Sequence, residues 1–159
     1  MPTSAPFRSF DLAELDVATA HGHLLSGVGP RPIAWASTVD ADGRPNLAPF
    51  SYFNVFSTRP PLLIFSPNHA GRTGAPKDTY LNVKAVPEVV INVVTYGLAE
   101  HSNLTSAGYS HGVNEFDKAG LTPLAAETVR PFRVAESPVQ FECRVRQVIE
   151  LGSGGGAGN

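Results

Sequence analysis

Residues 139–151 show the strictest period in the chain, and this period limits what the chain can fold into. Apolar and polar residues alternate there, so a strand would present Val139, Phe141, Cys143, Val145, Ile149 and Leu151 on one face and Gln140, Glu142, Arg144, Arg146 and Glu150 on the other. A helix repeats every 3.6 residues and does not produce this pattern over such a length. The segment predicts a long β-strand with one apolar face.

Other segments extend the same prediction. Residues 33–39 and 45–51 flank Asp42-Gly43, a turn signal that predicts a β-hairpin. Residues 61–65 have the composition of a short buried strand, and residues 88–95 are a second strand dense in valine. Helical signals are shorter: one helix capped by Asp78 or Thr79 and running to residue 85, and two more over 98–107 and 114–119. With 14 prolines and 15 glycines between these runs, we expect a mostly β fold, a β-barrel with a few short helices.

Length and composition exclude several classes of protein. The 159 residues are enough for one domain, and 42% hydrophobic with 16% charged residues is typical of a globular chain. A net charge of −2 without a basic stripe argues against nucleic-acid binding. One cysteine, Cys143, excludes a disulfide framework within the chain, and its apolar neighbours predict an inert, inward-facing thiol. No stretch approaches the roughly 18 apolar residues of a membrane span, so we expect a cytoplasmic protein that does not bind membranes.

Recognisable catalytic motifs are missing from the sequence. Gly-x-Ser-x-Gly is absent and the carboxylates are scattered, so we expect no catalytic acid, base or nucleophile and no metal site. His21 and His23 would suit a metal only on a strand, and the alternative is a histidine pair near the end of a surface helix. Residues 152–157 fit a loose GxGxxA pattern but open no helix, so we interpret them as a hairpin loop. Because a loop after a long strand normally leads to another strand, we expect this chain to be part of a longer one, lacking its C-terminal strand or strands.

Two segments carry residues suited to a ligand. Lys77-Asp78-Thr79 stands at the start of a predicted helix, where free N–H groups and a lysine favour phosphate; an ordinary capped helix is the alternative. Residues 46–57 (NLAPFSYFNVFS) interleave aromatic and small polar side chains. That mixture suits a flat aromatic ligand, and an aromatic core strand is the alternative.

Taken together, these segments resemble the flavin-reductase-like, FMN-binding split-barrel family in its flavoredoxin-type branch. The matching stretches follow one another in order from about residue 21 to the C-terminus. They are residues 30–38 (PRPIAWAST), 42–54 (DGRPNLAPFSYFN), 60–61, 65–66, 77–79 with Asn82, 90–93, 103–107, 114–116 and 135–140.

This resemblance implies a single flavin-binding split-barrel domain over residues 1–159 and a set of cofactor-binding residues. Ser51, Tyr52, Phe53 and Asn54 would lie along the flavin, with Arg31 and Phe50 bordering its pocket. Ser66, Lys77 and Thr79 would anchor the phosphate. Asn103 and Ser106 would approach the ring, with the partner subunit of a homodimer as one possible source of these two residues.

The function implied is that of an FMN-dependent oxidoreductase. NADH or NADPH would reduce the flavin, and the electrons would pass to a second flavin, a monooxygenase or a small redox protein. A non-catalytic FMN carrier or store of the same fold is the alternative. A related split barrel that binds haem or pyridoxal phosphate is a third reading, disfavoured for haem because no histidine lies within residues 46–57.

Overall fold

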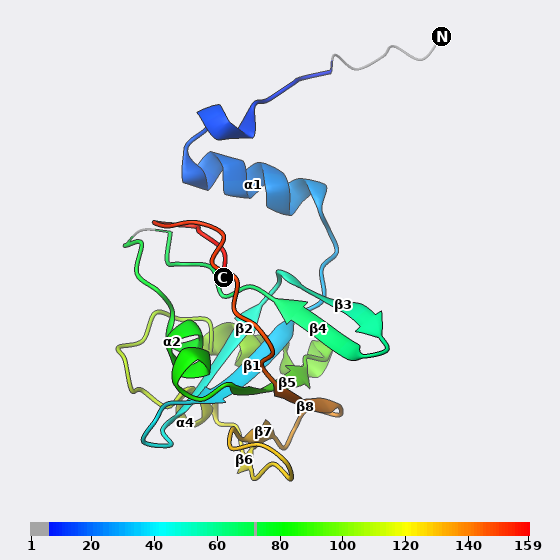
Figure 1. Ribbon diagram of the computed structural model, residues 1–159, viewed down its shortest axis with the longest axis vertical. Coiled ribbons are helices and arrows are strands. Elements are labelled where there is room, and N and C mark those ends of the chain that lie inside the picture. The colour runs from blue at the N-terminus through cyan, green and yellow to red at the C-terminus, as the bar shows by residue number, and fades with distance from the viewer. Residues whose placement is uncertain (1–6, 72) are drawn as a thin grey trace.

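An antiparallel four-stranded sheet, in the order β2-β1-β5-β8, forms the centre of the protein (Figure 1). The computed structural model describes residues 7–71 and 73–159. The strands are β1 (Ala34–Val39), β2 (Pro45–Phe50), β5 (Glu88–Val93) and β8 (Gln140–Arg144). The predicted hairpin is confirmed: β1 pairs with β2, with Ala36 opposite Ala48, and Gly43 takes the positive φ of 85° that its turn requires.

Each face of this sheet is covered by different elements. On one face Trp35, Leu47 and Phe116 form a buried cluster under α3 (Ala99–Leu104) and α4 (Glu115–Ala119). On the other face Ala34, Phe50 and Ile91 pack with the hairpin of β3 (Phe53–Thr58) and β4 (Pro61–Phe65). The helix α2 (Asp78–Ala85) covers the Thr38 end of this second face.

The mostly β prediction is confirmed, with some boundaries corrected. Residues 45–57 are two strands, because the chain breaks at Ser51 and Tyr52 and then pairs with β4. The predicted strand 61–65 has the right bounds but is half-exposed rather than buried. The predicted helix 98–107 is α3, shorter and preceded by a 3-10 turn at Tyr96–Leu98, and Asn114 caps α4. In the part of the chain that the structure describes, no strand pair joins β3–β4 to the four-stranded sheet, so a closed barrel stays a prediction.

The predicted strand 139–151 was too long. β8 ends at Arg144 because its partner β5 begins at Glu88. The Val145 N–H still donates to the Pro87 carbonyl, at 2.9 Å, but proline has no N–H to return and the chain before it is α2. Residues 146–151 therefore leave the sheet.

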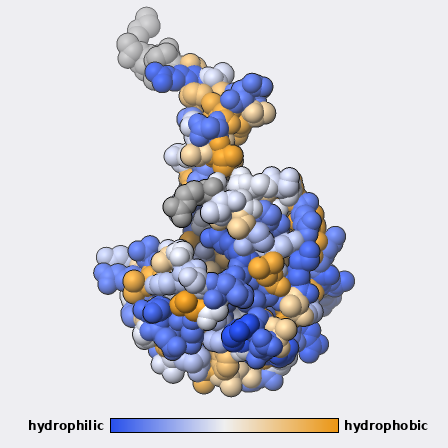
Figure 2. Space-filling view, turned by 90° about the vertical axis from the view of Figure 1, so that its left-hand side faces the viewer, coloured by the Kyte–Doolittle hydropathy of each residue, from blue (hydrophilic) through white to orange (hydrophobic). Residues whose placement is uncertain are grey.

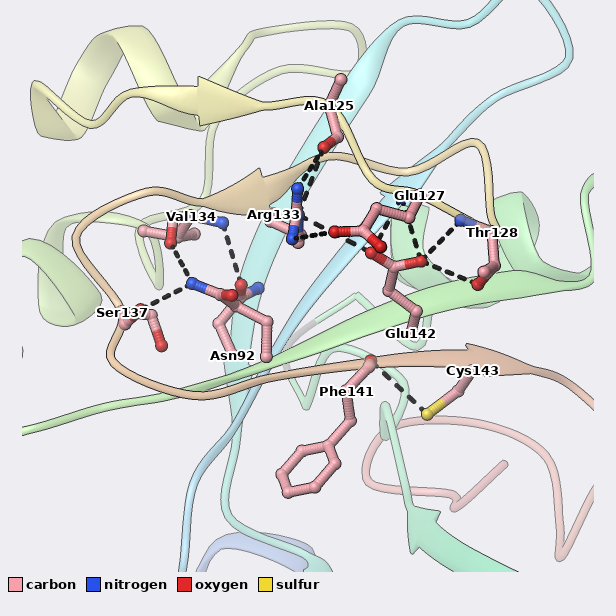
Figure 3. Close-up of polar contacts among 11 residues, drawn as sticks. Asn92, Ala125, Glu127, Thr128, Arg133, Val134, Ser137, Phe141, Glu142 and Cys143 are labelled. Carbon is pink, nitrogen blue, oxygen red and sulfur yellow. Dashed lines mark hydrogen bonds and ion pairs between the residues drawn. The ribbon is translucent and has the colours of Figure 1, made fainter.

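A polar cluster attaches the segment of β6 (Pro123–Leu124) and β7 (Arg133–Val134) to β8 (Figure 3). The Glu142 carboxylate accepts from the N–H of Glu127 at 2.9 Å and from the N–H and hydroxyl of Thr128, each at 2.7 Å. These bonds hold the pKa of Glu142 below its usual value. Phe141 and Cys143 extend from the other side of the strand, as the alternation predicts. Cys143 is half-buried against the second apolar cluster, and burial raises the pKa of its thiol.

The bounds of the N-terminal helix α1 (Val17–Gly27) were not predicted, but the interpretation of His21 and His23 as part of a surface helix is confirmed. Asp16 caps this helix, and none of its residues is buried. It stands apart from the body in both overall views (Figures 1 and 2). His23 stacks on Phe10, with ring centroids 4.4 Å apart, while His21 lies edge-on to Tyr52 at 6.4 Å. The two histidines thus lie within a helix and have different neighbours, so the strand that a shared metal would need is absent.

Within the described ranges, no group of three or more His, Cys, Asp or Glu side chains is placed to hold a metal ion. None of the helices described is long and apolar enough to cross a membrane.

Candidate functional site

The end of β2 brings together an aromatic ring and a cation that the sequence predicted to share a site. Phe50 is 6% exposed, and the Lys77 ammonium lies 5.7 Å from the centroid of its ring. Phe65, at the end of β4, lies 5.7 Å from Phe50, centroid to centroid. The exposed lysine thus places a positive charge beside one aromatic ring at the edge of an apolar cluster.

Arg31 and Ser51 also meet at this end of the sheet. The Arg31 Nε donates to the Ser51 hydroxyl at 3.3 Å, and its Nη1 donates to the carbonyls of Leu25, at 2.9 Å, and Val28. The guanidinium therefore connects the C-terminal end of α1 to the residue after β2. Arg31 thus lies beside Ser51, at the end of β2.

The remaining residues of the 51–54 segment lie at the start of the β3–β4 hairpin. Tyr52 accepts through its carbonyl from the Ser66 N–H at 2.9 Å. Phe53 packs against the second apolar cluster, and Asn54 is exposed, with its side-chain oxygen accepting from the N–H of Val55. Tyr52 and Ser66 are thus neighbours, close to the ends of β2 and β4.

Ser66 has contacts that the sequence did not reveal. Its hydroxyl donates to Asn68 Oδ1 at 2.8 Å and accepts from the N–H of Asn159 at 3.2 Å. Residues 150–159, which we call the strap, therefore reach the predicted phosphate anchor. The glycine run at 152–158 was the available signal, but from sequence it indicated only a loop.

Thr79 is placed differently from the prediction. Its side chain is 1% exposed, and its hydroxyl accepts from Asn46 Nδ2 at 3.0 Å within a buried network that includes Thr38. This placement argues against the hydroxyl as a phosphate donor. The helix cap is also corrected: Lys77 is the N-cap, and Asp78 is the first helical residue, paired with His111 at 2.9 Å. The N–H of Thr79 remains in the first turn of α2, where backbone donors lack helical partners.

Asn103 and Ser106 lie together, but on the other face of the sheet. They line a surface hollow of about 260 Å³ whose other residues are mainly apolar: Ile33, Pro49, Val94, Ala99 and Ser102. Pro49 belongs to the face of β2 that carries Leu47, whereas Phe50 belongs to the opposite face. The predicted site residues therefore form two groups, one around Phe50 and Lys77 and one around Asn103.

Glu115 is a buried acid that belongs to neither group. It is 7% exposed, and its carboxylate accepts from the Leu47 N–H at 3.0 Å. Burial raises the pKa of Glu115 above its usual value. Its contact is with the backbone of β2, so we assign it a structural role.

Comparison with known families shows which family has this arrangement. The sequence model of the flavin reductase like domain matches residues 27–155. The chain belongs to this family. The match spans all four strands of the central sheet and both groups of predicted site residues, and it begins at the last residue of α1.

Curated relatives extend the comparison. An uncharacterized protein of Aquifex aeolicus is 39% identical over 142 residues, which is 89% of this chain and 72% of that protein. The next three curated relatives are aligned over 61–64% of their own length, so this chain spans somewhat less than two thirds of those proteins.

Two solved structures share the fold over most of the chain. The nitrilotriacetate monooxygenase component B of Bacillus cereus superposes with a TM-score of 0.89 and 28% identity, covering 98% of this chain and 77% of that one. The 2-nitrobenzoate 2-nitroreductase NbaA of Pseudomonas fluorescens gives a TM-score of 0.79 and 26% identity, covering 89% and 67%.

Proposed function

We propose that this member of the flavin reductase like family binds FMN and passes electrons from NADH or NADPH to an acceptor. The family match over residues 27–155 carries the proposal. The group around Phe50 supports it, because it places a cation, aromatic rings and a helix start at one end of the sheet.

These residues fit a flavin nucleotide. The Lys77 ammonium and the first N–H groups of α2 suit the phosphate, because a helix start attracts anions. Ser66 is the third proposed anchor. Phe50 and the 51–54 segment offer an apolar surface with backbone polar groups, as a flat ring requires. FMN would supply the hydride chemistry, and the chain would bind and orient it.

We propose that Asn103 and Ser106 complete the site of a second subunit. They lie on the opposite face of β2 from Phe50, so a homodimer is a simple way for both groups to contact one flavin. The hollow of about 260 Å³ beside them is lined by apolar residues, which suits an aromatic ring edge.

The proposed acceptor is a monooxygenase component, and the name of the Bacillus cereus structural neighbour supports this choice. A free flavin or a small redox protein would accept electrons by the same chemistry. Because the donor is a reduced nicotinamide, the proposal includes a cytoplasmic location.

The test is a visible absorption spectrum of the purified protein, recorded under argon after adding FMN and then NADH or NADPH. Tight FMN binding with bleaching on addition of the nicotinamide is the expected result. Bound FMN that does not bleach would indicate a carrier, and a protein that leaves the spectrum of free FMN unchanged would refute the proposal. FAD, titrated in parallel, separates the two flavin nucleotides.

A further inference from the structure

The strap, residues 150–159, connects the two elements that carry the proposed phosphate anchors. At its start, the Glu150 carboxylate accepts from the Tyr80 hydroxyl and from Lys84 Nζ, the latter at 3.1 Å. Tyr80 and Lys84 belong to α2, the helix that follows Lys77. Figure 1 shows the red strap lying beside the loop that leaves β4.

The far end of the strap is bonded to the loop after β4. The His69 N–H donates to the Ala157 carbonyl at 2.9 Å, and the Gly156 N–H donates to the His69 carbonyl at 3.2 Å. Asn68 Nδ2 donates to the Gly156 carbonyl at 3.2 Å. These three bonds place the strap directly beside Ser66.

Glycine is required at several points of this contact. A Cβ on Gly155 would collide with the carbonyl of Gly71, and Gly156 has a φ of 81°. A Cβ on Gly158 would lie 3.1 Å from the Ser66 hydroxyl and 3.3 Å from the Leu151 side chain. Side-chain atoms can move by a few tenths of an ångström, so alanine at 158 would displace the Ser66 hydroxyl without breaking the strap.

The region under the strap contains polar groups that remain unused. Among the residues that the structure describes, only three buried side-chain polar atoms lack a hydrogen-bond partner, and two of them, His69 Nδ1 and Asn159 Oδ1, lie here. Buried polar atoms are rarely left unpaired in folded proteins. Asn159 Oδ1 can only accept a hydrogen bond, so it does not itself bind a phosphate; the donors that this region offers to an anion are the Ser66 hydroxyl and the Asn159 N–H.

We propose that the strap positions the Ser66 hydroxyl and the Asn159 N–H as a pair of donors to the phosphate of the bound flavin nucleotide. This inference rests on the proposed function. Without ligand, the Ser66 hydroxyl donates a hydrogen bond to Asn68 and accepts one from the Asn159 N–H. A phosphate dianion only accepts hydrogen bonds. When the nucleotide binds, the Ser66 hydroxyl therefore donates to the phosphate instead of to Asn68, and the Asn159 N–H donates to the phosphate instead of to Ser66.

The test compares Gly158→Ala with Gly152→Ala. Both substitutions lie in the strap, but a Cβ on Gly152 meets only the Ala157 methyl at an ordinary 3.7 Å. We expect Gly158→Ala to raise the dissociation constant of FMN about tenfold, the scale of one charge-assisted hydrogen bond. Riboflavin, which has no phosphate, should bind both variants and the wild type equally. In a Ser66→Ala background, Gly158→Ala should have no further effect on FMN.

The outcomes separate this inference from the proposed function. If Gly158→Ala weakens FMN and riboflavin alike, or weakens FMN equally in the Ser66→Ala background, the strap does not act through Ser66 and the inference is overturned. If the wild type binds FMN no better than riboflavin, the assignment of the phosphate donors is wrong, but the proposal that the protein binds a flavin is retained. A wild type that binds neither flavin overturns both.

Discussion

Replacing Thr79 by valine should destabilise the fold and leave flavin affinity nearly unchanged, whereas replacing Lys77 by methionine should do the reverse. The Thr79 hydroxyl is buried and accepts from Asn46 at 3.0 Å. Valine has the same shape without the oxygen, so the Asn46 amide loses one of its partners inside the protein. Such a loss costs about 1–2 kcal/mol, which lowers Tm by roughly 2–8 °C in a chain of this size.

Lys77 is exposed and takes no part in that network, so Lys77→Met should shift Tm little. It removes a charged contact to the phosphate worth about 1.5–3 kcal/mol, or roughly a 10- to 100-fold rise in the dissociation constant of FMN. The two variants are compared by thermal unfolding without flavin and by titration of FMN fluorescence. If Thr79→Val weakens FMN tenfold at unchanged Tm, the hydroxyl contacts the phosphate after all and the reasoning is refuted.

Three further variants test the roles of single residues. Cys143→Ala should leave the rate of electron transfer from the nicotinamide unchanged, and a large loss of that rate would contradict the assignment of an inert thiol. Because burial raises the pKa of the Cys143 thiol, this thiol should react with a disulfide reagent far more slowly in the native protein than in the unfolded chain. Glu115→Gln should raise the free energy of unfolding at pH 7, because burial raises the pKa of Glu115 above its usual 4.5 and its ionised form is costly in the fold. That gain in the free energy of unfolding should vanish as the pH falls below 4.5. Urea titrations of both proteins at pH 7 and below pH 4.5 measure the difference. Gly155→Ala should detach the strap from Gly71 and expose both segments to limited proteolysis, while Gly152→Ala should not.

Local sequence determined the parts of the fold whose partners are close in the chain. The β1–β2 hairpin could be predicted because the Asp42-Gly43 turn lies between its strands, and α2 because its start and the proline after it are both visible. The end of β8 could not, because an alternating pattern says which face is apolar but not where the partner strand begins. α1 lacked any signal of burial, since its side chains cover no core.

Long-range contacts explain where the structure places several of the predicted site residues. The Thr79 hydroxyl turns inward because of Asn46, which is 33 residues away. Asn103 and Phe50 were expected around one ring, with a partner subunit as one source of Asn103, and the alternation of side chains along β2 places their surroundings on opposite faces of one chain. The strap's contact with Ser66 spans 93 residues and has no local signature.

The distance in sequence between Ser66 and Asn159 also affects the order in which contacts form during synthesis. Neighbouring segments such as β1 and β2 can pair as soon as they leave the ribosome, since closing a short loop costs little entropy. Ser66 emerges early, but its bond from the Asn159 N–H can form only after the 93 residues that separate them have been synthesised. The central sheet of a nascent chain can therefore form before the strap reaches Ser66, and the contact between Asn159 and Ser66 forms after that sheet.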